Sequence, residues 1–367
     1  IGHPTRPILD QTGSLYHFAG VRAKTRRGRN FSLDSSGASR RNEIRVENSQ
    51  NPMSRSAYCL VLHAHLPLVL RHGRWPHGSD WLSEAALECY LPLLAAAEDL
   101  VAKGVSPKWT LNISPVLAEQ LGAPDFPAEL ELYLENRRRA CRENLEQFRR
   151  SERPDLAALV GFWEETLDRM WELFRRRGRN LLAAFADLDR AGHLQVITCA
   201  ATHGYLPLLS RDESLHLQLR AAIEAHRRHF GREPLGIWLP ECAYRPRAAL
   251  AEGIRPGIEE LLARYGLGFF VVDHHLVAGG SPLSPYRDRF PALGALAGEP
   301  APVAPPGGRS PYRTYRVASP GGASGATAFV RDPRSTFQVW SRDAGYPGDF
   351  AYLEFHKKHF PGGIRYW

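Results

Sequence analysis

The feature that most limits how this chain can fold is the alternation of short apolar runs with amphipathic segments from Met53 onward. This alternation is the pattern of a parallel β-sheet whose strands are joined by helical crossovers. Each apolar run is bounded by residues typical of turns or helix starts. We therefore expect an α/β fold with strands over Ala57 to Leu62, Trp109 to Ile113, Leu194 to Ala200, Leu235 to Leu239 and Gly268 to Asp273.

One helix is clearly signalled, over Asp212 to Phe230. Ser210 and Glu213 have the spacing of a capping box, in which each side chain satisfies a backbone donor at the helix start. Gly231 follows the last residue of this helix, as is common at helix C-termini.

A helical insertion is expected at about residues 125–193, because the stretch up to His193 has the pattern of successive long helices. The runs Arg137 to Arg139 and Arg175 to Arg177 are expected on solvated faces. Pro and Gly dominate residues 279–325, which indicates a long irregular loop or extension near a site. Residues 355–367 contain no closing strand, helix or cap that the sequence identifies.

Residues 1–52 differ from the rest of the chain. They are rich in Arg, Ser, Gly and Asn without a sustained period, which predicts a disordered extension. They hold nine Lys and Arg against four Asp and Glu, whereas the remaining residues hold 38 against 35. The formal net charge of +8 is therefore mostly that of a basic tail and does not indicate nucleic-acid binding. We interpret the tail as lying upstream of a true start at Met53, with an Arg- and Ser-rich transit peptide as the alternative.

Composition narrows the class of protein further. A chain of 367 residues with 43% hydrophobic residues can bury a large core. Its five cysteines are scattered and form no C-x-x-C pair, so neither a disulfide framework nor a cysteine zinc site is indicated. No apolar run approaches the length of a membrane span, and the first residues lack the apolar core of a signal peptide. We expect a cytoplasmic enzyme with no membrane partner.

Polar residues stand at the ends of four expected strands. Ligands of parallel sheets and barrels bind at the carboxyl ends of the strands, so the joint placement of these residues predicts a site there. They are His63 and His65 after the first strand, His203 after the third, Trp238 and Glu241 at the end of the fourth, and Asp273, His274 and His275 after the fifth.

Glu241 is the candidate nucleophile. A carboxylate beside Trp238 and Pro240 suits attack on a sugar, since the rings shape the sugar subsites and neighbouring donors keep the carboxylate ionised. A structural salt bridge to Arg245 or Arg247 is the equally weighted alternative. The three histidines His63, His65 and His203 are expected to donate hydrogen bonds to sugar hydroxyls and to the nucleophile.

Three motifs make a family resemblance specific: H-A-H-L-P from His63, A-T-H-G-Y-L-P-L-L from Ala201 and W-L-P-E-C-A-Y from Trp238. Together they resemble the first three sequence regions of glycoside hydrolase family 57, particularly its 1,4-α-glucan branching enzymes. The later F-V-V-D-H-H and V-W-S-R-D-A-G-Y-P-G-D segments are similar to branching enzymes as well. The resemblance runs from about Tyr58 to the end of the chain.

This resemblance implies an incomplete (β/α)7 barrel with a helical insertion and a retaining double displacement on α-1,4-glucans, without a cofactor. The family nucleophile falls on Glu241, and a glucan 6-hydroxyl attacks the glycosyl-enzyme to give an α-1,6 branch. The substrate-binding residues that it implies are His63, His65, His203 and Trp238, and Trp340 is placed as a glucan-stacking residue by the later segment. Asp273 is interpreted as structural or substrate-orienting.

The sequence also departs from the family pattern. The family acid/base is an Asp in a fourth motif of the kind D-x-E-L-F-G-H-W-W, and no such run occurs here. Retaining glycosidases need a second carboxyl group to protonate the leaving oxygen. We therefore expect a truncated fragment that lacks the fourth motif and the C-terminal helices, with impaired turnover.

Other functions stay open at this point. The same first motifs serve 4-α-glucanotransferases and α-amylases, and a cleft without an acid can bind glucan without turnover. A metal-dependent deacetylase-like enzyme is the rival from another class, because His63 and His65 with Asp273, His274 and His275 offer metal-ligand types. Two adjacent histidines on an extended segment point to opposite faces, so at most one of His274 and His275 can join such a site.

Overall fold

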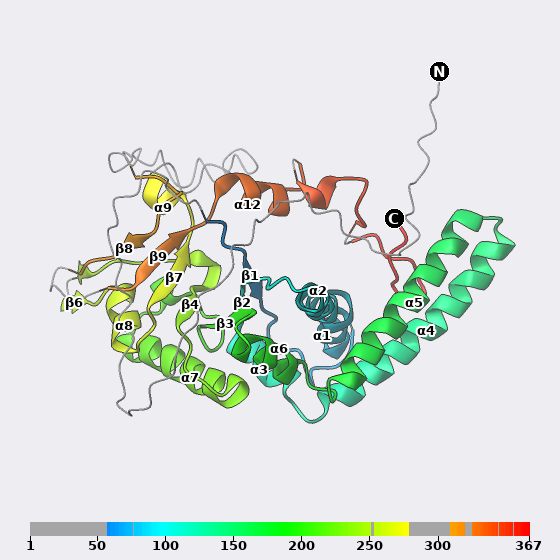
Figure 1. Cartoon of the computed structure of the whole chain (residues 1–367), viewed down its shortest axis with the longest axis horizontal. Helices are drawn as coiled ribbons and strands as arrows, with labels where there is room; N and C mark the ends of the chain where they lie inside the picture. Colours follow the sequence, from blue (N-terminus) through cyan, green and yellow to red (C-terminus); the bar gives the residue numbers. More distant parts are fainter. Residues whose placement is uncertain are drawn as a thin grey trace, which may run out of the picture. The chain divides into compact units, whose positions relative to one another are not determined.

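The computed structural model describes residues 57–75, 77–250, 253–278, 309–319, 325–343, 345–354 and 356–367 (Figure 1). The expected disordered extension over residues 1–52 lies outside the described residues, as does most of the irregular stretch 279–325.

Seven strands form one sheet in the order β1-β2-β3-β4-β7-β9-β8. All neighbours from β1 to β9 are parallel, and β8 is antiparallel to β9. Among the described strands, β1 and β8 each pair on one side only, so the sheet is open, and the predicted α/β class with a largely parallel sheet is confirmed. The strands are β1 Val61–Ala64, β2 Trp109–Ile113, β3 Leu194–Cys199, β4 Gly236–Trp238, β7 Phe269–Val272, β8 Tyr315–Arg316 and β9 Thr327–Val330.

The five expected strands all exist, with ends shifted by up to four residues for β1 and by one or none elsewhere. Strand β3 lies inside the sheet, and its consecutive residues Val196 and Ile197 are both fully buried. Successive strand residues face opposite sides, so both faces of the sheet are covered at this point. Strands β8 and β9 were not expected, nor was the separate antiparallel pair β5 Ala248–Leu250 and β6 Gly253–Arg255.

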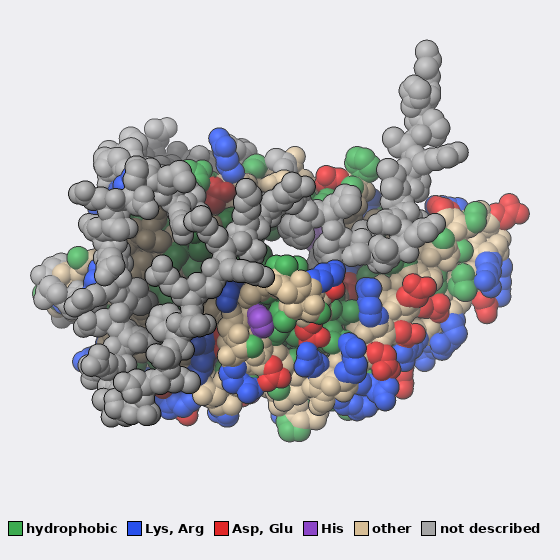
Figure 2. All heavy atoms as spheres, viewed as in Figure 1, with side chains coloured by type: hydrophobic (Ala, Val, Ile, Leu, Met, Phe, Trp, Pro, Cys, Tyr) green, Lys and Arg blue, Asp and Glu red, His purple; other side chains and the backbone are tan. Residues whose placement is uncertain are grey.

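Helices account for most of the remaining described chain (Figure 1). The expected insertion is helical: α4, α5 and α6 follow one another between β2 and β3, and acidic and basic side chains intermingle over the outer face of α4 and α5 (Figure 2). The helices are α1 Ser79–Ala85, the π-helical η1 Ala86–Tyr90, α2 Leu91–Ala102, α3 Pro115–Leu121, α4 Phe126–Arg150, α5 Pro154–Arg176, α6 Leu181–Arg190, α7 Asp212–Phe230, α8 Ile258–Arg264, α9 His275–Ala278 and α12 Pro333–Trp340, with short 3-10 turns η2 Leu206–Leu208, η3 Pro240–Cys242 and η4 Tyr346–Gly348.

Helix α7 has the predicted limits, but its predicted capping box is wrong. Gly231 closes the helix in the left-handed conformation with φ of 74°. At the other end Arg211 is the N-cap residue, and no side chain caps the helix there. The first turn is held instead from outside, because Arg255 donates two hydrogen bonds to Asp212 at 3.1 and 3.0 Å. A sequence spacing alone does not reveal such a partner 43 residues away.

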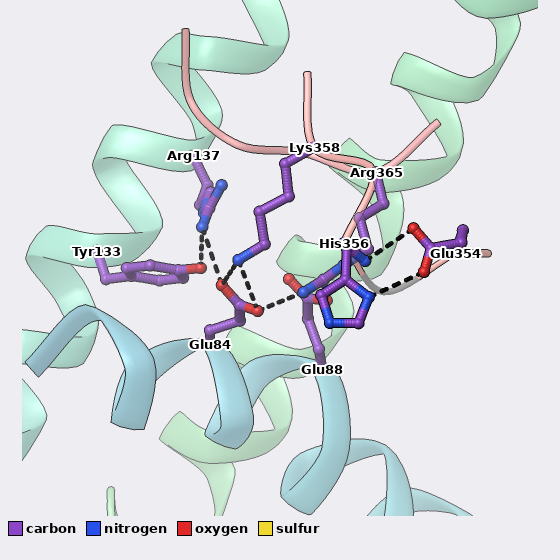
Figure 3. A network of polar contacts seen from close by, with 8 residues as sticks. All are labelled: Glu84, Glu88, Tyr133, Arg137, Glu354, His356, Lys358 and Arg365. Carbon is purple, nitrogen blue, oxygen red and sulfur yellow. Dashed lines mark hydrogen bonds and ion pairs between the residues drawn. The ribbon is translucent and has the colours of Figure 1, made fainter. Parts of the chain in front are cut away.

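The expectation of solvated faces holds for Arg175 to Arg177, which are exposed, but is wrong for Arg137. The Arg137 side chain is 11% exposed and reaches Glu84 on α1 at 3.5 Å. Figure 3 shows Lys358 and Arg365 meeting the same carboxylate from the C-terminal segment, residues 356–367. This segment forms no helix or named strand, as expected, yet Arg365 is buried because Glu84 and Glu88 both pair with it.

None of the helices in the described part of the chain is long and apolar enough to cross a membrane.

Candidate active site

The carboxyl ends of the six parallel strands share one edge of the sheet, and the predicted histidines meet there. The ring of His203 lies 3.8 Å from that of His65 and 5.2 Å from that of His63, measured between centroids. Trp238 stacks on His63, with its ring 4.7 Å from that of His63 and inclined by 11°. Residues from β1, β3 and β4, which are up to 175 positions apart in the chain, thus form one aromatic stack.

Two side chains, one on β2 and one directly after it, contact this stack, and neither was predicted as a site residue. Asn112, which is fully buried, lies 2.6 Å from Nδ1 of His63 through its Oδ1. Ser114, also fully buried, places its Oγ 2.9 Å from Nδ1 of His65. The signal was present, since Asn112 and Ser114 end an apolar run exactly as the selected residues do, but neither residue type stands out as catalytic.

Burial sets the charge of the three histidines. It lowers the pKa of His63 to about 4, although the hydrogen bond to Asn112 acts in the opposite direction. Burial likewise lowers the pKa of His65 to about 4. The pKa of His203 is also lowered by burial, against the attraction of the negative Glu241. All three imidazoles are therefore neutral at pH 7 and stack as uncharged rings.

Glu241 follows β4 in a tight turn and is exposed to solvent. Its backbone is left-handed, with φ of 56°, as are those of Cys242 at 55° and His203 at 59°. Left-handed backbone is uncommon for residues other than glycine, and residues held in it cluster at functional sites. Here the conformation turns the Glu241 side chain away from the buried core that Pro240 and Cys242 occupy on either side of it.

The alternative in which Glu241 serves a structural salt bridge is not observed. Arg245 donates to the backbone oxygens of Pro246 and Pro256, and Arg247 forms two hydrogen bonds to Glu260. Within the described residues, Glu241 forms no ion pair. Its carboxylate is thus open to a ligand.

Asp273, at the end of β7, is bound by a residue that the sequence analysis missed. Arg331, directly after β9, donates a hydrogen bond from Nη1 to Oδ1 of Asp273 at 2.7 Å. The same Nη1 lies 3.9 Å from Sγ of Cys242, beside Glu241. The Arg331 guanidinium also stands 5.3 Å from the ring centroid of Trp340, which is 65% exposed at the end of α12. Arg331 thus links Asp273 and Trp340 to the turn that carries Glu241.

The geometry offers no ligand set to the metal-dependent alternative. Across the described residues, no three His, Cys, Asp or Glu side chains are disposed to hold a metal ion. His274 and His275 are also not on an extended segment as expected, because α9 begins at His275.

The family model described as glycosyl hydrolase family 57 matches residues 59–360. A 1,4-alpha-glucan branching enzyme from Thermococcus kodakarensis is 36% identical over 312 residues, which are 84% of this chain and 43% of that protein.

Two crystal structures extend the comparison. That of a family 57 branching enzyme from Thermococcus kodakaraensis, in complex with glucose, has a TM-score of 0.71 and 34% identity, covering 85% of this chain and 54% of the other. The alpha-amylase AmyC from Thermotoga maritima has a TM-score of 0.64 and 27% identity, with 83% and 51% covered. The chain therefore spans about half the length of the relatives it matches.

Proposed function

This chain belongs to glycosyl hydrolase family 57, and we propose that it acts on α-1,4-glucans as a branching enzyme with Glu241 as the nucleophile. The observation that carries the proposal is the solvent-exposed Glu241 carboxylate at the carboxyl end of the sheet, which forms no ion pair within the described residues and acts electrostatically on His203. Similarity to branching enzymes at 34 to 36% identity supports the choice of reaction.

In the proposed reaction, Glu241 attacks the anomeric carbon of an α-1,4-linked glucose, and the bond to the leaving O4 breaks. The leaving oxygen takes a proton from an acid, and a covalent glycosyl-enzyme remains. A 6-hydroxyl of another glucan segment then attacks the anomeric carbon, gives its proton to the conjugate base of that acid and releases Glu241. One α-1,4 bond is exchanged for one α-1,6 bond, so the number of glycosidic bonds is unchanged.

The remaining site residues are assigned from their contacts. The neutral histidine stack and Trp238 line the position next to Glu241, where uncharged rings exclude water and favour the electrostatic interactions of the transition state. Trp340 is proposed as a stacking platform for a more distant glucose unit, because its ring is exposed and lies on the guanidinium of Arg331. Asp273 is engaged by Arg331, so we assign it to orienting Arg331 rather than to proton donation.

The substrate, the product and the domain organisation are part of the same proposal.

Product analysis with amylose tests the reaction type. The chain should convert amylose to a product with α-1,6 signals in the proton NMR spectrum without a matching rise in reducing ends, and Glu241→Gln should form none. A rise in reducing ends alone identifies an amylase, and redistribution of chain lengths without α-1,6 signals identifies a glucanotransferase. Either result would replace branching as the proposed reaction.

A further inference from the structure

The three site histidines differ in how their ring nitrogens are used. His63 has both engaged: Nδ1 lies 2.6 Å from Oδ1 of Asn112, and Nε2 lies 3.2 Å from Nε2 of His203. His65 has Nδ1 on Ser114 at 2.9 Å, while its Nε2 contacts no described residue by a hydrogen bond. A nitrogen pair at 3.2 Å requires one N–H donor and one lone pair. One of the two rings must therefore carry its proton on Nε2, and the other must carry its proton on Nδ1.

The order is set at Asn112, because its amide orientation is determined by two further contacts. Nδ2 of Asn112 donates to the backbone oxygens of Thr198 at 2.7 Å and Ile197 at 3.2 Å. A carbonyl oxygen in the Nδ2 position would face two other carbonyl oxygens in a fully buried place and leave all of them without a donor, which is strongly unfavourable. Oδ1 therefore points to His63 and can only accept a hydrogen bond.

We propose that Asn112 is a positioning residue that holds His63 as the Nδ1–H tautomer and thereby makes His203 the donor from Nε2 to His63. Each group then donates a hydrogen bond to the next: His203 to His63, His63 to Asn112, and Asn112 to backbone carbonyls of β3. Since each imidazole is neutral at pH 7, each ring carries a single N–H proton, and the direction of these hydrogen bonds is fixed. The charged groups that act on this pair are Glu241 toward His203 and Arg331 toward His63.

With the protons placed in this way, the three histidines have different roles at the proposed sugar site. This part of the inference rests on the proposed function. His63 has no ring nitrogen left for a sugar hydroxyl and serves to fix the ring of His203 next to Glu241. The Nε2 of His65, which has no hydrogen-bond partner among the described residues, remains for a hydroxyl of the substrate.

Nitrogen-15 NMR with labelled histidine tests the proposal without substrate or turnover, so its failure would leave the assignment of Glu241 untouched. At pH 7, His63 should show a protonated Nδ1 and an unprotonated Nε2, and His203 a protonated Nε2. A protonated Nε2 on His63 in the wild-type chain overturns the proposal.

Three variants separate positioning from mere packing. Asn112→Ala removes the acceptor, so His63 should lose the fixed Nδ1–H form. Asn112→Asp keeps an acceptor facing His63, and its second oxygen must carry a proton because it faces the carbonyl oxygens of Thr198 and Ile197, so His63 should retain the Nδ1–H form. Ser114→Ala, two residues along at an equally buried position, removes the partner of His65 and should change the His65 signals while leaving the His63 tautomer unchanged. If Asn112→Ala and Asn112→Asp both keep, or both lose, the His63 tautomer, Asn112 does not set it. If Asn112→Ala does not fold, the wild-type spectrum and Asn112→Asp still decide.

Discussion

Arg331 donates a hydrogen bond to Asp273 over 2.7 Å and so joins the carboxyl ends of the neighbouring strands β9 and β7. The same guanidinium stands 5.3 Å from the ring centroid of Trp340. A platform for glucan at Trp340 therefore depends on a residue that need not touch the glucan. Substitutions of Arg331 and Trp340 should therefore have coupled effects on glucan binding, and this coupling can be tested.

We predict that Trp340→Ala and Arg331→Ala both weaken maltooligosaccharide binding and that their effects are not additive. A cation–π contact at an exposed site contributes about 0.5–1 kcal/mol, so the double variant should bind about 2- to 5-fold better than the sum of the two losses predicts. Titration calorimetry on the four proteins of the cycle measures this coupling. Phe337→Ala is the control, because Phe337 is similarly exposed on the same helix and should leave binding unchanged.

The sequence was sufficient to predict the strands that carry the strongest motifs and the residues at their ends. The rings of His63, His65, His203 and Trp238 lie together because parallel strands bring their carboxyl ends to one edge, and the charge of Glu241 acts on His203. Their roles in catalysis and binding remain proposals.

The partners of these residues were not predictable in the same way. Arg331 was missed because β9 is only four residues long and follows a Pro- and Gly-rich stretch that concealed it. The first turn of α7 is held by Arg255, and Glu84 by Lys358 and Arg365, through pairs distant in sequence. Such contacts depend on tertiary packing, which local spacing does not encode.

The C-terminal segment should contribute strongly to stability through Arg365. Its side chain is 6% exposed and pairs with Glu84 and Glu88, so Arg365→Met leaves two carboxylates short of a partner. Breaking a buried pair in this way costs about 3–5 kcal/mol. Urea unfolding measures the loss. Arg150→Met, which breaks an exposed pair with Glu146, should cost no more than about 1 kcal/mol, and equal losses in the two variants would contradict this account.

His226 should make the fold sensitive to acid. It is buried on α7, neither ring nitrogen has a hydrogen-bond partner among the described residues, and burial with the nearby Arg232 charge lowers its pKa to about 3. In the unfolded chain His226 has a pKa near 6.5 and binds a proton that it does not bind in the native state. Stability is therefore lost as the pH falls from about 6.5 towards 3.

His226→Leu should therefore reduce the loss of unfolding free energy between pH 7 and pH 5 by about 2 kcal/mol. Chemical denaturation at the two pH values measures it. Phe230→Leu, next to His226 on the same helix, removes no titrating group and should cost the same free energy at both pH values. A pH dependence of His226→Leu equal to that of the wild-type chain would rule out this role for His226.

Covalent trapping tests the central claim, that Glu241 is the nucleophile, most directly. A maltotriosyl fluoride is a suitable donor, because fluoride leaves with little need of a proton from an acid, so the first step depends mainly on the nucleophile. Intact-mass and peptide mass spectrometry should find one added maltotriosyl group on Glu241 and none on a folded Glu241→Gln variant. An adduct on Asp273, or a wild-type chain that stays unmodified while it binds the donor, would contradict the account.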